Sequence, residues 1–177
     1  MKDLNVSTTL SRKLDTPSIL KGNLDPQTTV HNTQYKTFNF HKKIYGYECD
    51  VYGHLNNAIY LQIYEAARAE ALFEMNLPIA KLKEMNIAVF VIKAEIHYKK
   101  GILLEETVTV KSMMSSLDRL NSIWEQEIYN SNDELCSNVT IHAVFVSDNK
   151  PTRISKKLEE YFRGRALGVR HQENNHP

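Results

Sequence analysis

The chain has 177 residues, of which 42% are hydrophobic and 24% charged, an ordinary composition for one globular domain. The formal net charge of +1 lacks the basic excess expected of a dedicated nucleic-acid-binding protein. The longest apolar run, residues 87–92, is too short to span a bilayer, and no secretory signal pattern opens the chain. Two cysteines, Cys49 and Cys136, make no disulfide framework, so we expect a cytoplasmic protein.

The composition and the hydrophobic pattern of the chain change near residue 35. Residues 1–34 are polar and without periodicity, which predicts an extension lacking regular structure, whereas residues 35–168 are expected to form the domain and residues 169–177 a flexible tail. Residues 37–48 read as a strand, and a turn over residues 50–57 follows. Residues 58–75 are rich in Ala, Leu and Glu and predict a long helix with Asn56 or Asn57 as its N-cap. Its apolar residues cover much of its circumference, which indicates a helix wrapped by other structure.

The second half of the chain reads mainly as strands. A short helix is expected over residues 79–85, strands over residues 92–98, 107–113, 120–129 and 138–145, and a basic helix over residues 155–167. A strand, a long helix and then an antiparallel meander predict an α+β domain in which a curled antiparallel sheet wraps one central helix. A cystatin-like cone is the alternative, but the strand before the long helix argues against it.

The segment Asp50–Ala58 reads DVYGHLNNA and joins the first strand to the long helix. Asp50 ends the strand, and Gly53 permits the tight reversal that the chain needs there. The first N–H groups of a helix have no internal partner and can polarise a carbonyl group that becomes an oxyanion. A nearby carboxylate can attack that carbonyl or take a proton from water. The segment therefore suits acyl-group hydrolysis, although Asp in such a turn is also a common helix cap.

The same segment resembles a known active site. The pattern Asp50-x-x-Gly53-His54-x-Asn56-Asn57, with Tyr60 and the run Glu65-Ala-Ala-Arg68 behind it, is similar to hotdog-fold acyl-CoA thioesterases of the 4-hydroxybenzoyl-CoA thioesterase group. The resemblance covers about residues 37–166 and includes the run Tyr98-Lys-Lys-Gly101. It implies a hotdog fold, no metal and no cofactor, since coenzyme A belongs to the substrate, and a homodimer or higher oligomer with sites at the subunit interface.

The resemblance also implies roles for individual residues. Asp50 matches the catalytic aspartate, as nucleophile or general base, and the backbone N–H of Asn57 matches the group that polarises the thioester carbonyl. Tyr60 and Glu65 match positions of the central helix that similar residues usually fill; their role is mostly structural, and Glu65 is the one of the two expected to matter for the site. His54 either holds the turn or assists proton transfer. The positions expected to support or contact the substrate are Gly53, Asn56 and Tyr60. The His-x-Asn-Asn form is closer to members that act on fatty acyl groups than to hydroxybenzoyl-specific ones.

Basic residues offer contacts for the phosphates of coenzyme A. Lys99, Lys100 and Arg153 are the candidates, although solvated basic loops would look the same. Cys49 is a weaker candidate for a thiol nucleophile, because neighbouring side chains on a strand point to opposite faces. His97 and His142 are expected on the surface, and no metal-ligand spacing is evident.

The sequence therefore predicts a fatty acyl-CoA thioesterase. Two alternatives remain: a thioesterase acting on acyl carrier protein, with which the basic residues would then make contact, and a non-catalytic acyl-CoA-binding protein. Acyl chain length depends on how deep a tunnel opens between the long helix and its partner subunit. Four residues either line this tunnel or simply fill the core: Leu61, Met75, Phe90 and Trp124.

Overall fold

The computed structural model describes residues 36–166. Three helices, a 3-10 turn and six strands follow one another along this part of the chain. In chain order they are β1 (Thr37–Lys43), η1 (Gly46–Glu48), α1 (Asn57–Glu74), α2 (Ile79–Glu84), β2 (Ala88–Tyr98), β3 (Thr107–Leu117), β4 (Asn121–Tyr129), β5 (Leu135–Ser147), β6 (Lys150–Pro151) and α3 (Lys156–Ala166). The predicted extension at residues 1–34 and the predicted tail at residues 169–177 lie outside the described residues.

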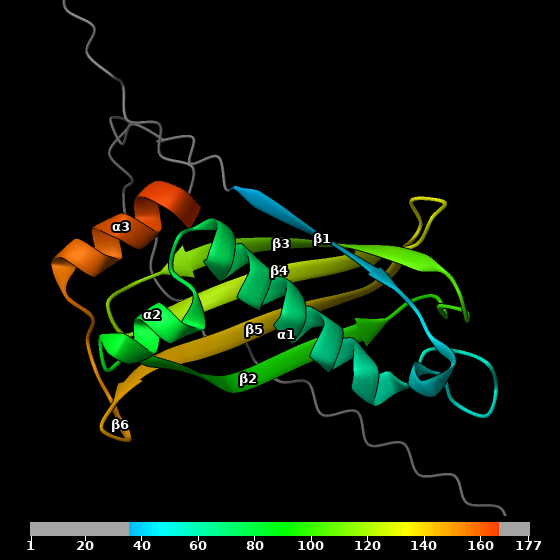
Figure 1. Cartoon of the computed structure of the whole chain (residues 1–177), viewed down its shortest axis with the longest axis horizontal. Helices are drawn as coiled ribbons and strands as arrows, with labels where there is room; N and C mark the ends of the chain where they lie inside the picture. The colour runs from blue at the N-terminus through cyan, green and yellow to red at the C-terminus, as the bar shows by residue number, and fades with distance from the viewer. Residues whose placement is uncertain (1–35, 167–177) are drawn as a thin grey trace, which may run out of the picture. The chain divides into compact units, whose positions relative to one another are not determined.

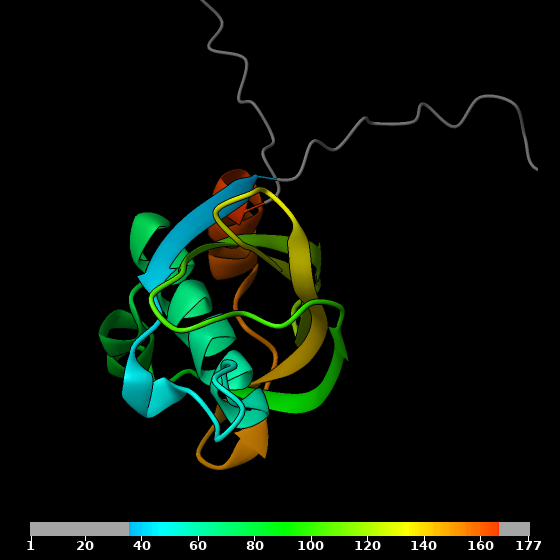
Figure 2. The same ribbon diagram turned by 90° about the vertical axis from the view of Figure 1, so that its right-hand side faces the viewer.

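All strand pairs of the sheet are antiparallel. The strands lie in the order β1-β3-β4-β5-β2, and β6 pairs with β5. The long helix α1 crosses one face of this sheet (Figure 1), and the end-on view shows the sheet curling around it (Figure 2). The predicted α+β architecture, a curled antiparallel sheet around one long helix, is confirmed.

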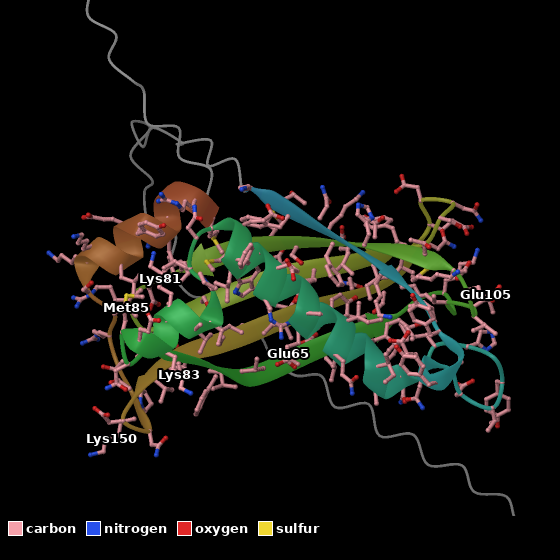
Figure 3. All side chains as sticks on the ribbon, viewed as in Figure 1. Glu65, Lys81, Lys83, Met85, Glu105 and Lys150 are labelled. Atoms are coloured by element: carbon pink, nitrogen blue, oxygen red, sulfur yellow. The ribbon has the colours of Figure 1, made fainter. Side chains whose placement is uncertain are left out.

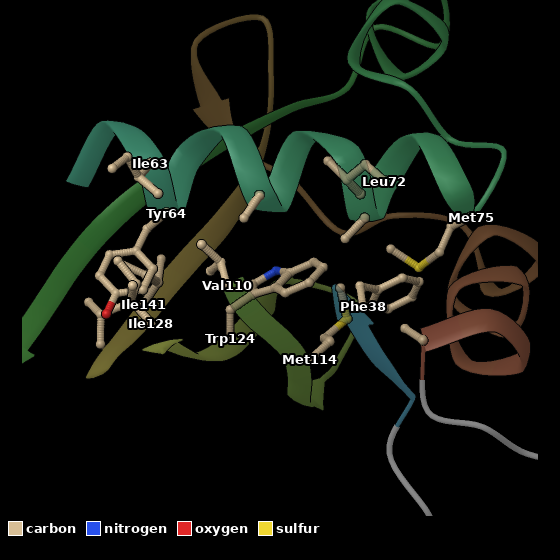
Figure 4. Close-up of a cluster of buried hydrophobic side chains, with 14 of the residues drawn as sticks. Phe38, Ile63, Tyr64, Leu72, Met75, Val110, Met114, Trp124, Ile128 and Ile141 are labelled. Carbon is tan, nitrogen blue, oxygen red and sulfur yellow. The ribbon is translucent and has the colours of Figure 1, made fainter. Parts of the chain in front are cut away.

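The core fills the space between α1 and the concave face of the sheet. Inward-facing residues alternate along β3 and β4, and their side chains meet those of α1 (Figure 4). Ala67 and Ala71 of α1 are fully buried, which lets the helix backbone approach the strands closely. The helix packs mainly against β1 and β3, so the part of the sheet nearer β2 receives less cover from it.

The predicted strand over residues 37–48 is wrong in its second half. β1 ends at Lys43, because the Glu48 carboxylate accepts hydrogen bonds from the Tyr45 N–H (2.9 Å) and the Lys42 Nζ (2.8 Å) and draws the chain into η1. The strand predicted to start at Ile92 begins earlier, at Ala88. Its inner and outer faces could not be told from alternation, since the register shifts between Val91 and Lys93.

β2 is an edge strand with exposed apolar side chains. Val89, Phe90, Val91 and Ile92 are between 37% and 64% exposed, which is unusual for a strand in a folded sheet. Long apolar edges favour pairing with another strand.

In residues 36–166, no helix is long and apolar enough to cross a membrane.

The close approach of α1 to the sheet gives a stability prediction. Ala67→Leu places a larger side chain where Ala67 has no exposed surface, and such overpacking should lower the free energy of unfolding by about 1–3 kcal/mol. Ala66→Leu, its exposed neighbour on α1, should change stability by less than about 0.5 kcal/mol. Urea unfolding measures both; equal effects of the two variants would contradict this packing.

Candidate active site

Asp50 lies in a small hairpin between η1 and α1. The Asp50 N–H donates to the His54 carbonyl (2.8 Å), and the Asn56 N–H donates to the Glu48 carbonyl (2.9 Å). At the tip, the Gly53 N–H donates to the Asp50 carbonyl (3.1 Å), and Gly53 has a φ of 80°, which favours glycine. The predicted role of Gly53 in a tight reversal is confirmed. The hairpin sets Asp50 opposite His54, immediately before the helix.

The two oxygens of the Asp50 carboxylate have different surroundings. Oδ1 accepts hydrogen bonds from the backbone N–H groups of Tyr52 (2.9 Å) and His54 (3.2 Å). Oδ2 has no hydrogen-bond partner among the described residues, and the side chain is only partly buried. One oxygen therefore fixes the turn, while the other is available to a substrate or a water molecule.

The start of α1 leaves one donor unused. Asn56, one of the two predicted candidates, is the N-cap, and its side chain accepts a hydrogen bond from the Ala58 N–H (3.0 Å). The Ile59 N–H donates to the Asn56 carbonyl (2.9 Å). The backbone N–H of Asn57, the first residue of α1, has no acceptor within residues 36–166. An unpaired N–H at a helix start carries partial positive charge and suits a developing oxyanion.

His54 packs against the chain that leads into β3. Leu55 donates its N–H to the Ile102 carbonyl (2.8 Å), and His54 forms a bridge with Leu103. The imidazole lies over Gly101 so closely that a Cβ at Gly101 would stand 2.7 Å from Cδ2 of His54. Glycine at this position therefore sets where the ring lies, which the sequence alone did not indicate.

A pair of tyrosines supports the first turn of α1. Tyr60 is buried, which raises its pKa to about 12, and its ring meets that of Tyr98 edge-on with centroids 5.0 Å apart. The Tyr98 hydroxyl donates to the carbonyl of Asn57 (3.1 Å). Tyr60 is therefore a core residue that packs against Tyr98, and Tyr98 holds Asn57, whose N–H is unpaired among the described residues. Sequence reasoning missed this role of Tyr98, because its contact spans 41 residues.

The other predicted site residues do not gather at the hairpin. Glu65 follows Asn57 by eight residues, about 12 Å along the helix axis, and is exposed near the middle of α1 (Figure 3). Lys99 is exposed and lies two residues before Gly101, over which the His54 ring packs. Lys100 forms an ion pair with Glu134, which raises the pKa of Lys100. Arg153 follows β6, at the opposite end of the sheet (Figure 1). One chain therefore does not bring Arg153 together with Asp50.

Cysteine and metal chemistry find no support in the geometry. The Cys49 thiol points to the Tyr45 carbonyl (3.7 Å) and packs against the core, whereas Asp50 bonds within the turn, so the two side chains diverge as predicted. His97 is exposed on β2, as predicted, 3.6 Å from Glu95. The described residues contain no group of three or more His, Cys, Asp or Glu that could hold a metal ion.

A cavity of about 660 Å³ opens between α1, α2, the start of β2 and the concave face of the sheet. Of the four residues predicted either to line a tunnel or to fill the core, Phe90 and Trp124 line this cavity and Met75 is buried in the core. Leu61 is exposed and does neither. Glu65 and Arg68 stand on its α1 side. Its volume is in the range usual for small-molecule sites.

Comparisons with known proteins agree with the fold. Residues 46–162 match the family model described as the thioesterase-like superfamily. The chain is 35% identical over 86 residues to the long-chain acyl-CoA thioesterase FadM of Escherichia coli, a match that covers 49% of this chain and 64% of that relative. The match to a putative esterase of Aquifex aeolicus is weaker, 23% over 126 residues, covering 71% of this chain and 98% of that protein.

Solved structures share the architecture. A DHNA-CoA thioesterase from Staphylococcus aureus superposes with a TM-score of 0.64 at 23% identity, covering 72% of this chain and 85% of that one. The YbaW probable thioesterase from Escherichia coli gives a TM-score of 0.62 at 25% identity, covering 73% and 98%. With the family match spanning most of the domain, the chain belongs to the thioesterase-like superfamily of thioester hydrolases and has the hotdog fold.

Proposed function

We propose that this protein hydrolyses fatty acyl-CoA thioesters to the carboxylic acid and free coenzyme A. The observation that carries the proposal is the pairing of a free donor and a free acceptor at one turn: the Asn57 N–H and Oδ2 of Asp50. Family membership and the likeness to FadM support the reaction class. The predicted cytoplasmic location and the predicted absence of a cofactor remain predictions.

In the proposed mechanism, the thioester carbonyl oxygen accepts a hydrogen bond from the Asn57 N–H. Oδ2 of Asp50 either attacks the carbonyl carbon or removes a proton from an attacking water molecule. The oxyanion that forms is stabilised by the partial positive charge at the helix start, and its collapse expels the thiolate of coenzyme A. With water as the nucleophile this step gives the carboxylic acid directly; with Asp50 as the nucleophile it leaves a mixed anhydride, which a water molecule then hydrolyses to the acid and the free Asp50 carboxylate. Oδ1 stays bonded to the turn throughout and keeps the carboxylate in place.

An aliphatic acyl group fits better than a hydroxybenzoyl group. The cavity is lined largely by apolar side chains and is deep enough to reach Phe162 of α3. Its volume accommodates a flexible chain that a short aromatic acid would not fill. The alternatives are delivery of the acyl group by acyl carrier protein and binding without turnover. The Lys100 pairing with Glu134 leaves this lysine less available to either carrier, so turnover of matched acyl-CoA and acyl-carrier substrates is the measurement that separates them.

The exposed apolar edge of β2 supports a dimer. In a two-fold symmetric pair, each strand would run antiparallel to its copy, so the Tyr98 end of one β2 would lie beside the Ala88 end of the other. Tyr98 contacts the start of α1, whereas Ala88 lines the cavity. Such a dimer would bring the Asp50 hairpin of one protomer towards the cavity of its partner. Glu65 lines this cavity and lies away from Asp50 within one chain, so the dimer would also bring Glu65 of one protomer closer to the hairpin of the other.

The role of Asp50 is tested by Asp50→Asn, assayed by release of free thiol from acyl-CoAs of increasing chain length. The variant keeps an oxygen that accepts the Tyr52 and His54 N–H groups, so it should fold normally while losing about 10²- to 10⁴-fold in kcat. Asp148→Asn, at an exposed turn, is the matched control and should be fully active. Undiminished turnover by a folded Asp50→Asn protein would remove the carboxylate from the mechanism.

The position of the His54 ring is tested by Gly101→Ala. The added methyl group would meet the ring at 2.7 Å and displace it, so kcat/KM should fall by about tenfold, a barrier increase near 1.4 kcal/mol. Gly46→Ala is the matched control, because its methyl group would find its nearest neighbour, Leu104, at an ordinary 3.9 Å. If both variants retain full activity, the ring position is irrelevant to turnover.

The dimer is tested by Ile92→Glu in sedimentation velocity. Ile92 is 64% exposed on β2, and a buried unpaired carboxylate at a strand-to-strand interface should convert the dimer to monomer. Met85→Glu, an exposed apolar position outside the sheet, should leave the assembly intact. A native protein that sediments as a monomer at all concentrations would contradict pairing through β2.

A further inference from the structure

The cavity has a polar side that thioester hydrolysis at Asp50 does not use. Its floor includes the inward-facing residues Ser122 and Trp124 of β4, and Gln126, the next inward-facing residue of the strand, lies just beyond the lining. The four residue steps from Ser122 to Gln126 extend about 13 Å, a distance that an aliphatic chain ending at Arg68 can span. Phe145 and Phe162 close the apolar end, and Arg68 of α1 stands over Gln126 at the other.

Arg68 brings a positive charge into a largely apolar space. Its Nη1 donates to Oε1 of Gln126 (2.6 Å), and Gln126 is itself buried and donates to the Tyr64 carbonyl (3.0 Å) and the Ser112 hydroxyl (2.8 Å). These bonds occupy every atom of the Gln126 amide but only one of the five guanidinium N–H donors. Within residues 36–166, no carboxylate lies within 4.0 Å of Arg68.

The charges around the cavity favour an anion. Its charged lining residues are Arg68 and Lys83, which are cationic, and Glu65, which is anionic and exposed on α1 (Figure 3). Burial lowers the pKa of Arg68, and an arginine remains protonated even so. A guanidinium with unpaired donors in an apolar wall is best satisfied by a carboxylate, which it binds through two parallel hydrogen bonds.

We propose that this cavity binds a free carboxylic acid with an unbranched aliphatic chain, its carboxylate on Arg68 and its chain along Trp124 towards Phe162. The ligand belongs to the chemical class that the proposed hydrolysis releases, but binding requires neither Asp50 nor turnover. A bound acid would fill the space open to an acyl chain, so it would oppose the binding of further acyl-CoA.

Trp124 reports occupancy directly, because it is the only tryptophan of the chain. The full-length protein is titrated with dodecanoate and with dodecan-1-ol, below their aggregation limits, and Trp fluorescence is followed. The acid should bind about tenfold more tightly than the alcohol, the difference that one charge-assisted contact makes. Equal affinity for the two ligands, or no response to either, overturns the proposal without any variant.

Two variants locate the carboxylate. Arg68→Met should reduce the preference for the acid to about twofold or less while the alcohol binds as before. Lys83→Met, which removes the cation at the rim, is the matched control and should keep the preference. Retention of the full preference by a folded Arg68→Met protein overturns the assignment to Arg68.

The same titration in Asp50→Asn separates this proposal from the proposed reaction. Selective acid binding by that variant supports the cavity site whatever the outcome of the thiol-release assay. Loss of selective acid binding in Asp50→Asn, with Arg68 intact, would show that binding depends on the hairpin and not on the cavity alone, and would overturn the site proposed here.

Discussion

Glu48 is the residue on which the candidate site most depends. Its carboxylate, which is nearly fully buried, accepts from the Tyr45 N–H and pairs with Lys42, while its carbonyl accepts from the Asn56 N–H. The first two contacts end β1 and turn the chain into η1; the third fixes the residue that caps α1. Without this junction, neither Asp50 nor the first N–H of the helix would have a defined direction.

The off-centre position of α1 accounts for the remaining functional features. Because the helix lies against β1 and β3, the concave surface near β5 and β2 is left for the cavity, and β2 keeps an exposed apolar edge. A helix centred on the sheet would fill the cavity and would cover the apolar edge of β2. The hotdog fold in this chain therefore separates the candidate active site, at the start of α1, from the apolar cavity, further along the same helix.

The sequence predicted what local patterns encode. The cap at Asn56, the glycine turn at Gly53 and the long helix depend on residues close together in the chain, and the structure confirms all three. The end of β1 was missed because it depends on the side chain of Glu48 folding back, and β2 was misjudged because a bulge interrupts its alternation. Tyr98 and Gly101 act on residues more than forty positions earlier, and no periodicity signals such contacts.

The division of work between the two oxygens of Asp50 has an evolutionary consequence. One oxygen belongs to the architecture of the hairpin and the other is free, so most replacements at this position damage the fold and the chemistry together. Exchange of carboxylate for carboxamide is the exception, because it preserves the bonded oxygen and removes the negative charge. If Asp50 carries the proposed chemistry, a lineage with this hairpin can pass from enzyme to ligand sensor by a single codon change, with its hairpin and its cavity inherited intact.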